Sequence, residues 1–121
     1  MANILIADDS MFSRKVLADI IEQSGHTIAG EAENGQQAVE LYKQVKPDIV
    51  ILDITMPVID GLSASEEILS FDPNAKIVIC SALRQDYVIE FSYKIGVKAY
   101  LIKPFDPIKI NRVISELIAK S

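Results

Sequence analysis

The ten residues NILIADDSMF, residues 3–12, decide the fold. The apolar run 3–7 is rich in branched side chains, which is typical of a buried β-strand. It ends in two adjacent carboxylates, Asp8 and Asp9, and a helical pattern begins at about residue 11. Two like charges held side by side at the end of a buried strand repel each other, so the pair requires a functional explanation.

The composition is that of one ordinary globular domain. Of 121 residues, 50% are hydrophobic and 24% charged, so we expect a single domain over residues 1–121. The net charge of −5 argues against nucleic-acid binding by this domain, because such domains usually carry a basic patch. The apolar runs are too short to span a bilayer and we recognise no signal peptide, so we expect a cytoplasmic protein without membrane insertion. The lone cysteine, Cys80, is expected to be buried on a strand.

Short apolar runs alternate with helical patterns along the whole chain. Strands are expected at about 3–7, 27–32, 48–53, 76–81 and 98–102, and helices at about 11–24, 35–45, 62–71, 84–95 and 107–120. Five successive β–α units predict an α/β fold, in which a five-stranded parallel sheet carries five helices on its two faces. The run TIAGEA, residues 27–32, is more polar than the others and is expected at an edge of the sheet.

The helix boundaries carry local signals of their own. The first helix is expected to turn Val16, Leu17, Ile20, Ile21 and Ser24 inward, and Arg14, Lys15, Asp19 and Glu22 toward solvent. Gly25 follows, where a left-handed residue can end a helix. Asp106 and Pro107 open the last helix, because Asp accepts from free N–H groups and Pro fits the first turn.

Polar side chains follow four of the five expected strands. Asp8 and Asp9 end the first, Asp53 the third, Ser81 the fourth and Lys103 the fifth. Since the carboxyl ends of parallel strands share one edge, where open α/β sheets bind ligands, we expect these side chains to converge. Each has an ordinary explanation alone: a helix cap, a turn residue or a surface charge. Their coincidence at one edge favours a common site.

The chemistry of this set indicates metal-assisted phosphoryl transfer. Three close carboxylates need a cation, and oxygen ligands favour Mg²⁺. An aspartate can accept a phosphoryl group as a nucleophile. A metal, an ammonium and a hydroxyl are the groups that stabilise the charge on that phosphoryl group. Asp8 and Asp9 are therefore expected to hold the metal that lets Asp53 accept phosphate.

Four motifs make the chain resemble the response-regulator receiver family. They are ADDS at 7–10, ILDITMPVIDG at 51–61, CSA at 80–82 and YLIKPF at 100–105. The resemblance covers essentially the whole chain and is greatest to single-domain chemotaxis receivers of the CheY-like type. It implies a flavodoxin-like strand order, 2-1-3-4-5. It also implies a two-component switch that takes phosphate from a histidine kinase and catalyses only its own phosphorylation and dephosphorylation.

The resemblance implies a role for each residue of the site. Asp53 would be the phosphoacceptor. The expected Mg²⁺ ligands are Asp8, Asp9, Asp53 and the backbone carbonyl of Thr55. The groups expected to contact phosphate are Lys103, Ser81 and the N–H of Ala82.

Further residues are assigned to the switch and the loops by the same resemblance. Ser81 and Tyr100 form the expected switch pair, and the Lys103–Pro104 bond is expected to be cis. Thr55 and Leu83 are expected to flank the path of the water that removes phosphate. Gly61 is expected to supply backbone angles that other residues avoid.

The fourth expected helix, RQDYVIEFSYKI at 84–95, is apolar nearly all round. Helical spacing places Val88, Phe91, Ser92 and Ile95 against the sheet and leaves Tyr87, Ile89 and Tyr93 partly outside. The receiver resemblance makes Ile89, Tyr93 and Tyr100 the expected partner face. A flagellar motor switch component or a second copy of the chain would bind there. In the alternative, a rotated helix buries Ile89 in the core.

Three other interpretations remain. A Mg²⁺-dependent phosphatase with an aspartate nucleophile would carry an acid two residues after it, where this chain has Thr55. A pseudo-receiver would act only by binding partners, although all five polar positions are present. The chain could also be the receiver of a longer response regulator, since no output domain follows it.

Overall fold

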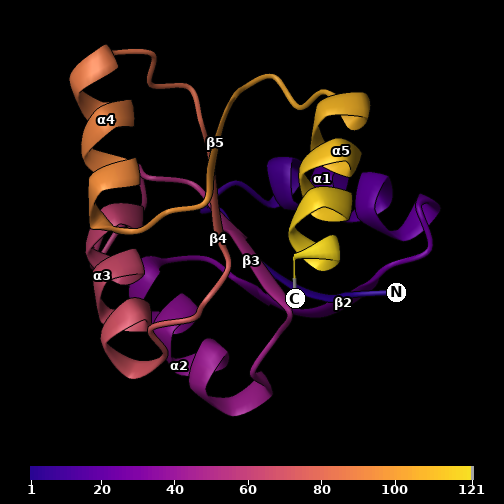
Figure 1. Cartoon of the computed structure of the whole chain (residues 1–121), viewed down its shortest axis with the longest axis horizontal. Helices are drawn as coiled ribbons and strands as arrows, with labels where there is room; N and C mark the ends of the chain where they lie inside the picture. The colour runs from indigo at the N-terminus through magenta and orange to yellow at the C-terminus, as the bar shows by residue number, and fades with distance from the viewer. Residues whose placement is uncertain (121) are drawn as a thin grey trace.

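The computed structural model describes residues 1–120, and shows a five-stranded sheet between two layers of helices (Figure 1). The strands are β1 (Asn3–Ala7), β2 (Thr27–Ala32), β3 (Ile49–Leu52), β4 (Ile77–Ser81) and β5 (Ala99–Ile102). The helices are α1 (Met11–Gln23), α2 (Gly35–Val45), α3 (Gly61–Phe71), α4 (Asp86–Ile95) and α5 (Pro107–Ala119). The ten predicted elements are confirmed, with ends that move by no more than two residues.

All neighbouring strands pair in parallel, in the order β2-β1-β3-β4-β5. This order confirms the predicted fold class. Helices α1 and α5 cover one face of the sheet, and α2, α3 and α4 cover the other (Figure 1). The polar strand β2 lies at one edge, as predicted, and β5 lies at the other.

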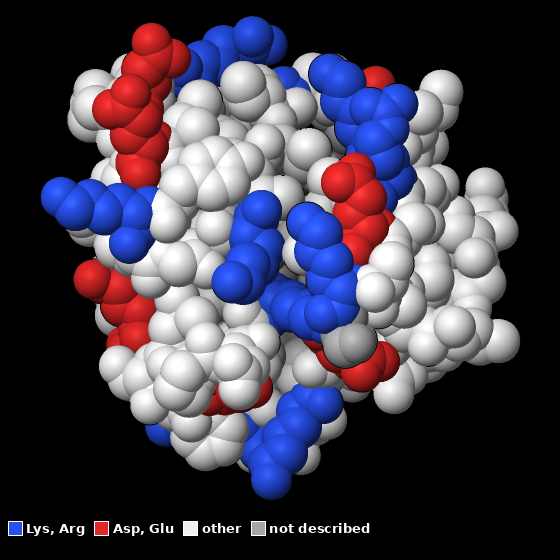
Figure 2. Space-filling model, viewed as in Figure 1, with Lys and Arg blue, Asp and Glu red and all other residues white. Residues whose placement is uncertain are grey.

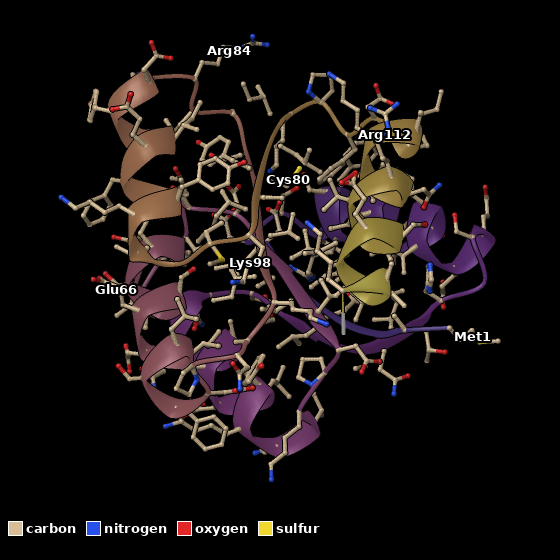
Figure 3. All side chains as sticks on the ribbon, viewed as in Figure 1. Met1, Glu66, Cys80, Arg84, Lys98 and Arg112 are labelled. Atoms are coloured by element: carbon tan, nitrogen blue, oxygen red, sulfur yellow. The ribbon has the colours of Figure 1, made fainter. Side chains whose placement is uncertain are left out.

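Each face of the sheet has its own apolar core. Strands β3 and β4 are buried at every residue, which explains their unbroken apolar sequences. The core under α1 and α5 includes Ile6, Leu17 and Ile114, and the core under α2 and α3 includes Leu5, Leu52 and Ile68. Cys80 is buried in the first of these, between β5 and α5 in the view of Figure 3.

The residues flanking the helices behave largely as their sequence signals indicate. Asp106 caps α5 by accepting from the Ile108 N–H, with Pro107 in the first turn. Gly25 has a φ of +87° just after α1, as expected for a left-handed residue there. Ser10 caps α1, its hydroxyl accepting from the Ser13 N–H at 3.2 Å.

Two assignments on α1 are wrong. Arg14 was expected in solvent but is only 8% exposed, because its guanidinium finds acceptors beneath the helix. Ser24 was expected to face the core but is exposed at the C-terminal cap, where its hydroxyl hydrogen-bonds the Asn111 side chain.

The inward face of α4 is narrower than the sequence predicts. Val88 and Ile95 pack against the core. Ser92 is buried between them, and its hydroxyl donates to the Val88 carbonyl, which satisfies it there. Phe91 was expected in this stripe but is 46% exposed, so that prediction is wrong. Ile89 is half-buried and belongs to neither core, so the rotated-helix alternative is not supported.

Gly61 is required for space rather than for its backbone angles. Its φ is not in the left-handed region, contrary to the prediction, and Val58 in the same loop has a φ of +72°. The Gly61 N–H donates to the Ile54 carbonyl at 2.7 Å, which brings the start of α3 directly against β3. A Cβ at Gly61 would collide with the carbonyl oxygen of Asp53. The loop after Asp53 can therefore close only around a residue without a side chain.

We expect Gly61→Ala to lower the free energy of unfolding by about 2 kcal/mol or more, because the methyl group meets rigid backbone. Urea denaturation of both proteins measures the change. Ser70→Ala, at an exposed position of the same helix, is the matched control and should be nearly neutral. Equal stability of the Gly61→Ala and Ser70→Ala variants would contradict this account.

Candidate functional site

The strand ends bring three carboxylates together. β1 and β3 are neighbours, and the Asp53 N–H donates to the Ala7 carbonyl at 3.0 Å, so both strands end at the same level. Oxygen atoms of Asp8, Asp9 and Asp53 lie within 4.8 Å of one another. Asp8 is 3% and Asp53 8% exposed, whereas Asp9 faces solvent. Among the described residues this is the acidic cluster with the spacing that a metal ion requires.

Lys103, two strands away from β3, reaches back across the sheet edge to this cluster. Its Nζ lies 2.7 Å from Asp8 Oδ2 and 2.9 Å from Asp53 Oδ2. Burial alone would lower the pKa of the Lys103 ammonium, but the hydrogen bonds and charges of Asp8 and Asp53 outweigh it and raise that pKa. The ammonium therefore stays charged between the two carboxylates. The Lys103–Pro104 bond is cis, as expected.

Backbone amides hold the remaining oxygens of the two buried carboxylates. The Ser10 N–H donates to Asp8 Oδ1 at 2.9 Å, and the Ile54 N–H donates to Asp53 Oδ1 at 2.7 Å. Each side chain is thus held by one backbone amide and by the Lys103 ammonium, which the two carboxylates share. The ligand atoms offered are all oxygens, a set that suits a hard divalent cation.

Ser81 and Tyr100 are joined through Leu83. The Ser81 hydroxyl, 1% exposed at the end of β4, accepts from the Leu83 N–H at 3.2 Å. The Tyr100 hydroxyl donates to the Leu83 carbonyl at 2.8 Å, and the ring packs against the core under α2 and α3. Burial raises the pKa of Tyr100, although a hydrogen bond with Ser81 works in the opposite direction. The structure thus brings the predicted switch pair together.

Tyr93 extends this network to α4. The backbone N–H of Tyr100, on the outer edge of β5, donates to the Tyr93 hydroxyl at 3.0 Å. Tyr93 is 48% exposed, and Ile89 lies one turn before it on the same helix. The three residues of the predicted partner face therefore lie on adjoining elements, and Tyr93 and Tyr100 are in direct contact.

Comparison with known proteins identifies the family. The sequence pattern of the response regulator receiver domain matches residues 4–115. The chain belongs to the response regulator receiver family.

Individual relatives agree with this assignment. A chemotaxis protein CheY of Thermotoga maritima is 46% identical over 94% of this chain and 95% of its own length. A chemotaxis protein CheY of Listeria monocytogenes is 44% identical over 97% of this chain and 96% of its own length. The fold also matches a chain in the crystal structure of a CheX–CheY complex from Borrelia burgdorferi, with a TM-score of 0.93 and 36% identity over 96% of this chain and 88% of that one.

The remaining predicted site residues of this receiver domain lie around the cluster. Thr55 and Ala82 are exposed, just after Asp53 and Ser81 respectively, and Leu83 is half-buried. Sequence reasoning missed Arg14, whose Nη1 donates to the Asp8 carbonyl at 2.7 Å. Its one detectable signal is a cation at the first turn of a helix that begins beside two aspartates.

Two recesses on the receiver surface differ sharply in character. An apolar recess of about 490 Å³ adjoins the acidic cluster, lined by Phe12, Ser13, Val16, Lys103, Pro104 and Phe105. A recess of about 590 Å³ near the start of β5 is lined by Pro73, Asn74, Lys76, Lys98, Leu117 and Lys120. Figure 2 shows Lys and Arg side chains gathered near the middle of the face that it draws, and Lys98 is labelled in that region in Figure 3. Over residues 1–120, no helix combines the length and apolar character needed to cross a bilayer.

The thiol of Cys80 provides a pH test of this region. Burial, with smaller effects from the neighbouring charges, raises the pKa of Cys80 to about 12, whereas an unfolded thiol ionises near about 8.5. Because the folded pKa is raised, the stability that Cys80 contributes is complete below about pH 8.5 and is lost as pH rises toward 12. We expect Cys80→Val to lose less free energy of unfolding than the wild type between about pH 8 and about pH 10. Urea denaturation at both pH values measures this, and equal losses would show that the thiol is not held neutral.

Proposed function

We propose that the chain is a phosphoacceptor switch of a two-component system, and that Asp53 accepts the phosphoryl group. The supporting observation is the convergence of three carboxylates and the Lys103 ammonium at the carboxyl edge of a receiver fold. The whole chain, residues 1–121, would be one receiver domain. It acts as a signalling protein whose only catalysis is on its own phosphoryl group.

The residues present fit a Mg²⁺ ion. Asp8, Asp9 and Asp53 would hold it, since their carboxylate oxygens lie within 4.8 Å of one another, and the backbone carbonyl of Thr55, two residues after Asp53, would complete the set. When bound, the ion supplies positive charge that neutralises oxygens of the phosphoryl group. Asp9, which faces solvent beside two buried carboxylates, gives the ion a path of entry.

The chain's own groups perform the transfer. A carboxylate oxygen of Asp53 attacks phosphorus, the bond to the donor histidine nitrogen breaks, and that nitrogen keeps the electron pair. Lys103, already 2.9 Å from Asp53 Oδ2, then pairs with the phosphoryl oxygens. The Ser81 hydroxyl and the Ala82 N–H donate to the same oxygens. Thr55 and Leu83 flank the path of the water that later hydrolyses the acyl phosphate.

Phosphorylation reaches the surface through the contacts of Ser81. When the Ser81 hydroxyl turns to the phosphoryl group, it leaves the Leu83 N–H, and Leu83 is also where the Tyr100 hydroxyl is bound. The packing of Tyr100 therefore depends on the position of this loop. Since Tyr100 also contacts Tyr93 of α4, the α4–β5–α5 face changes its affinity for a partner.

The relatives point to chemotaxis as the process. Several relatives at 41–46% identity over nearly the whole chain are chemotaxis proteins CheY. A cytoplasmic histidine kinase would supply phosphate, docking over the apolar recess beside Lys103. A flagellar motor switch component or a second copy of the chain would be the output partner, and no nucleic acid is bound by this domain itself. A pseudo-receiver that only binds partners is disfavoured, because the site has its full set of groups.

Asp53→Asn should abolish phosphorylation by acetyl phosphate with Mg²⁺, because an amide cannot act as the nucleophile. Intact-protein mass spectrometry measures the phosphorylated fraction. Asp19→Asn, which removes an exposed carboxylate from α1, is the control and should react at the wild-type rate. A wild-type rate in the Asp53→Asn protein would place the phosphoacceptor elsewhere.

Mg²⁺ should raise the melting temperature of the wild type, because a ligand that binds only the folded state stabilises it, by about 2.7 kcal/mol at one hundred times its Kd. Asp9→Ala should remove most of this rise, and Asp19→Ala should keep it. Differential scanning calorimetry with and without Mg²⁺ gives the comparison. The metal assignment is wrong if the Asp9→Ala protein responds like the wild type.

Ile89→Asp should weaken phosphorylation-dependent binding about tenfold or more, since a carboxylate would replace apolar contact at the partner face. Binding to the motor switch protein of the same organism, and self-association, are measured with and without acetyl phosphate. Folding and phosphorylation should stay normal, and Glu90→Ala, at an exposed position of α4, should bind like the wild type. If Ile89→Asp unfolds the domain, Ile89 is a core residue and the face is wrongly placed.

A further inference from the structure

Arg14 is a buried cation directly behind the loop that carries Asp8 and Asp9. It is 8% exposed on α1, where its Nη1 donates to the Asp8 carbonyl at 2.7 Å. Its Nε lies 3.2 Å from Glu31 Oε1, at the end of the edge strand β2. The guanidinium thus connects a helix, an edge strand and the β1–α1 loop at one point.

The contacts of Asp8 show what this connection does. Its N–H donates to the Ala32 carbonyl at 3.0 Å, and its two carboxylate oxygens accept from the Ser10 N–H and from Lys103. Arg14 supplies the remaining contact, to the Asp8 carbonyl. That carbonyl belongs to the peptide bond between Asp8 and Asp9. Its orientation therefore sets the direction in which the Asp9 carboxylate leaves the chain.

Electrostatic repulsion and loop geometry predict opposite effects of Arg14 on metal binding. A guanidinium near a cation site repels the cation, so removing it should strengthen metal binding if electrostatics dominated. Glu31 offsets part of this charge, but it is about half exposed and the pair is screened by solvent. If the loop geometry dominates, removing Arg14 should weaken metal binding. The sign of the change therefore separates the two effects.

We infer that Arg14, anchored by Glu31, is a positioning residue that fixes the Asp8–Asp9 peptide so that both carboxylates face one cation. The inference rests on the Mg²⁺ site of the proposed function. Groups that orient metal ligands typically change metal affinity by about 10- to 100-fold when removed. Arginine suits this place because its planar fork reaches a carbonyl and a carboxylate together, which one ammonium does less well.

The experiment measures the Mg²⁺ dissociation constant of the folded, unphosphorylated protein by isothermal titration calorimetry, and the metal-free melting temperature separately. Arg14→Met should bind Mg²⁺ about 10-fold more weakly, and Arg14→Lys should recover part of the loss. Lys15→Met removes the same charge from the exposed neighbouring residue and should leave the affinity within about twofold. A purely structural role would lower the melting temperature without changing the dissociation constant.

Glu31 supplies a second, milder test at a half-exposed position. Glu31→Ala removes the anchor of the guanidinium and should weaken Mg²⁺ binding, whereas Glu31→Gln keeps an oxygen acceptor for Nε and should bind like the wild type. If Arg14→Met does not fold, Arg14→Lys and the difference between Glu31→Ala and Glu31→Gln, which lose the same charge, decide the question. Unchanged or tighter Mg²⁺ binding in the folded Arg14 variants and Glu31→Ala would overturn the inference. A wild type that does not bind Mg²⁺ at all would instead overturn the proposed metal site.

Discussion

The acidic edge of this receiver depends on the ion pairs that the Lys103 ammonium makes with Asp8 and Asp53. Two of its three carboxylates, Asp8 and Asp53, are almost fully buried, and buried charges are tolerated only when they are paired and hydrogen-bonded. Lys103 pairs with both at once, from a strand that is not adjacent to either. This requires β1, β3 and β5 to end at one edge, as they do in a parallel sheet with this strand order. The strand order that defines the fold is therefore also what brings the charged groups of the site together.

The network leading away from the site is continuous. Hydrogen bonds run from Ser81 to Leu83, from Leu83 to Tyr100, and from Tyr100 to Tyr93 on α4. Each link joins a different segment, so the contacts connect the β4–α4 loop to the helix that carries the proposed partner face. Such a contiguous set of contacts is the kind of physical path that coupling between two sites can use.

Sequence alone was sufficient for the elements and for the convergence of the site. Strands such as β3 are apolar at every residue, and the strand-end position of Asp53 follows from the parallel topology without any side-chain geometry. Helical periodicity gave wrong placements for two kinds of side chain. One is a polar side chain that finds hydrogen-bond partners inside the protein, and the other is an apolar side chain that stays exposed. Arg14 is buried because acceptors lie beneath α1, and Ser92 occupies the inward face where Phe91 was also expected.

Backbone proximity was equally invisible in the sequence. The motif around Gly61 indicated a special residue, but only the structure shows that the reason is the Asp53 carbonyl rather than a left-handed angle. The Tyr93 contact joins a side chain to a main-chain amide seven residues away, and no pattern of residue types encodes it. Both features depend on how closely two segments approach, which hydrophobic periodicity does not specify.

The bond between the Tyr93 hydroxyl and the Tyr100 amide has a consequence for the solubility of the folded protein. β5 is an edge strand, and an unpaired edge is a template onto which a strand of another molecule can add. The Tyr93 hydroxyl accepts from one of the outward amides of this short strand. A second chain that approached to extend the sheet would have to displace it. The Tyr93 side chain therefore also opposes the addition of strands from other molecules to this edge of the sheet.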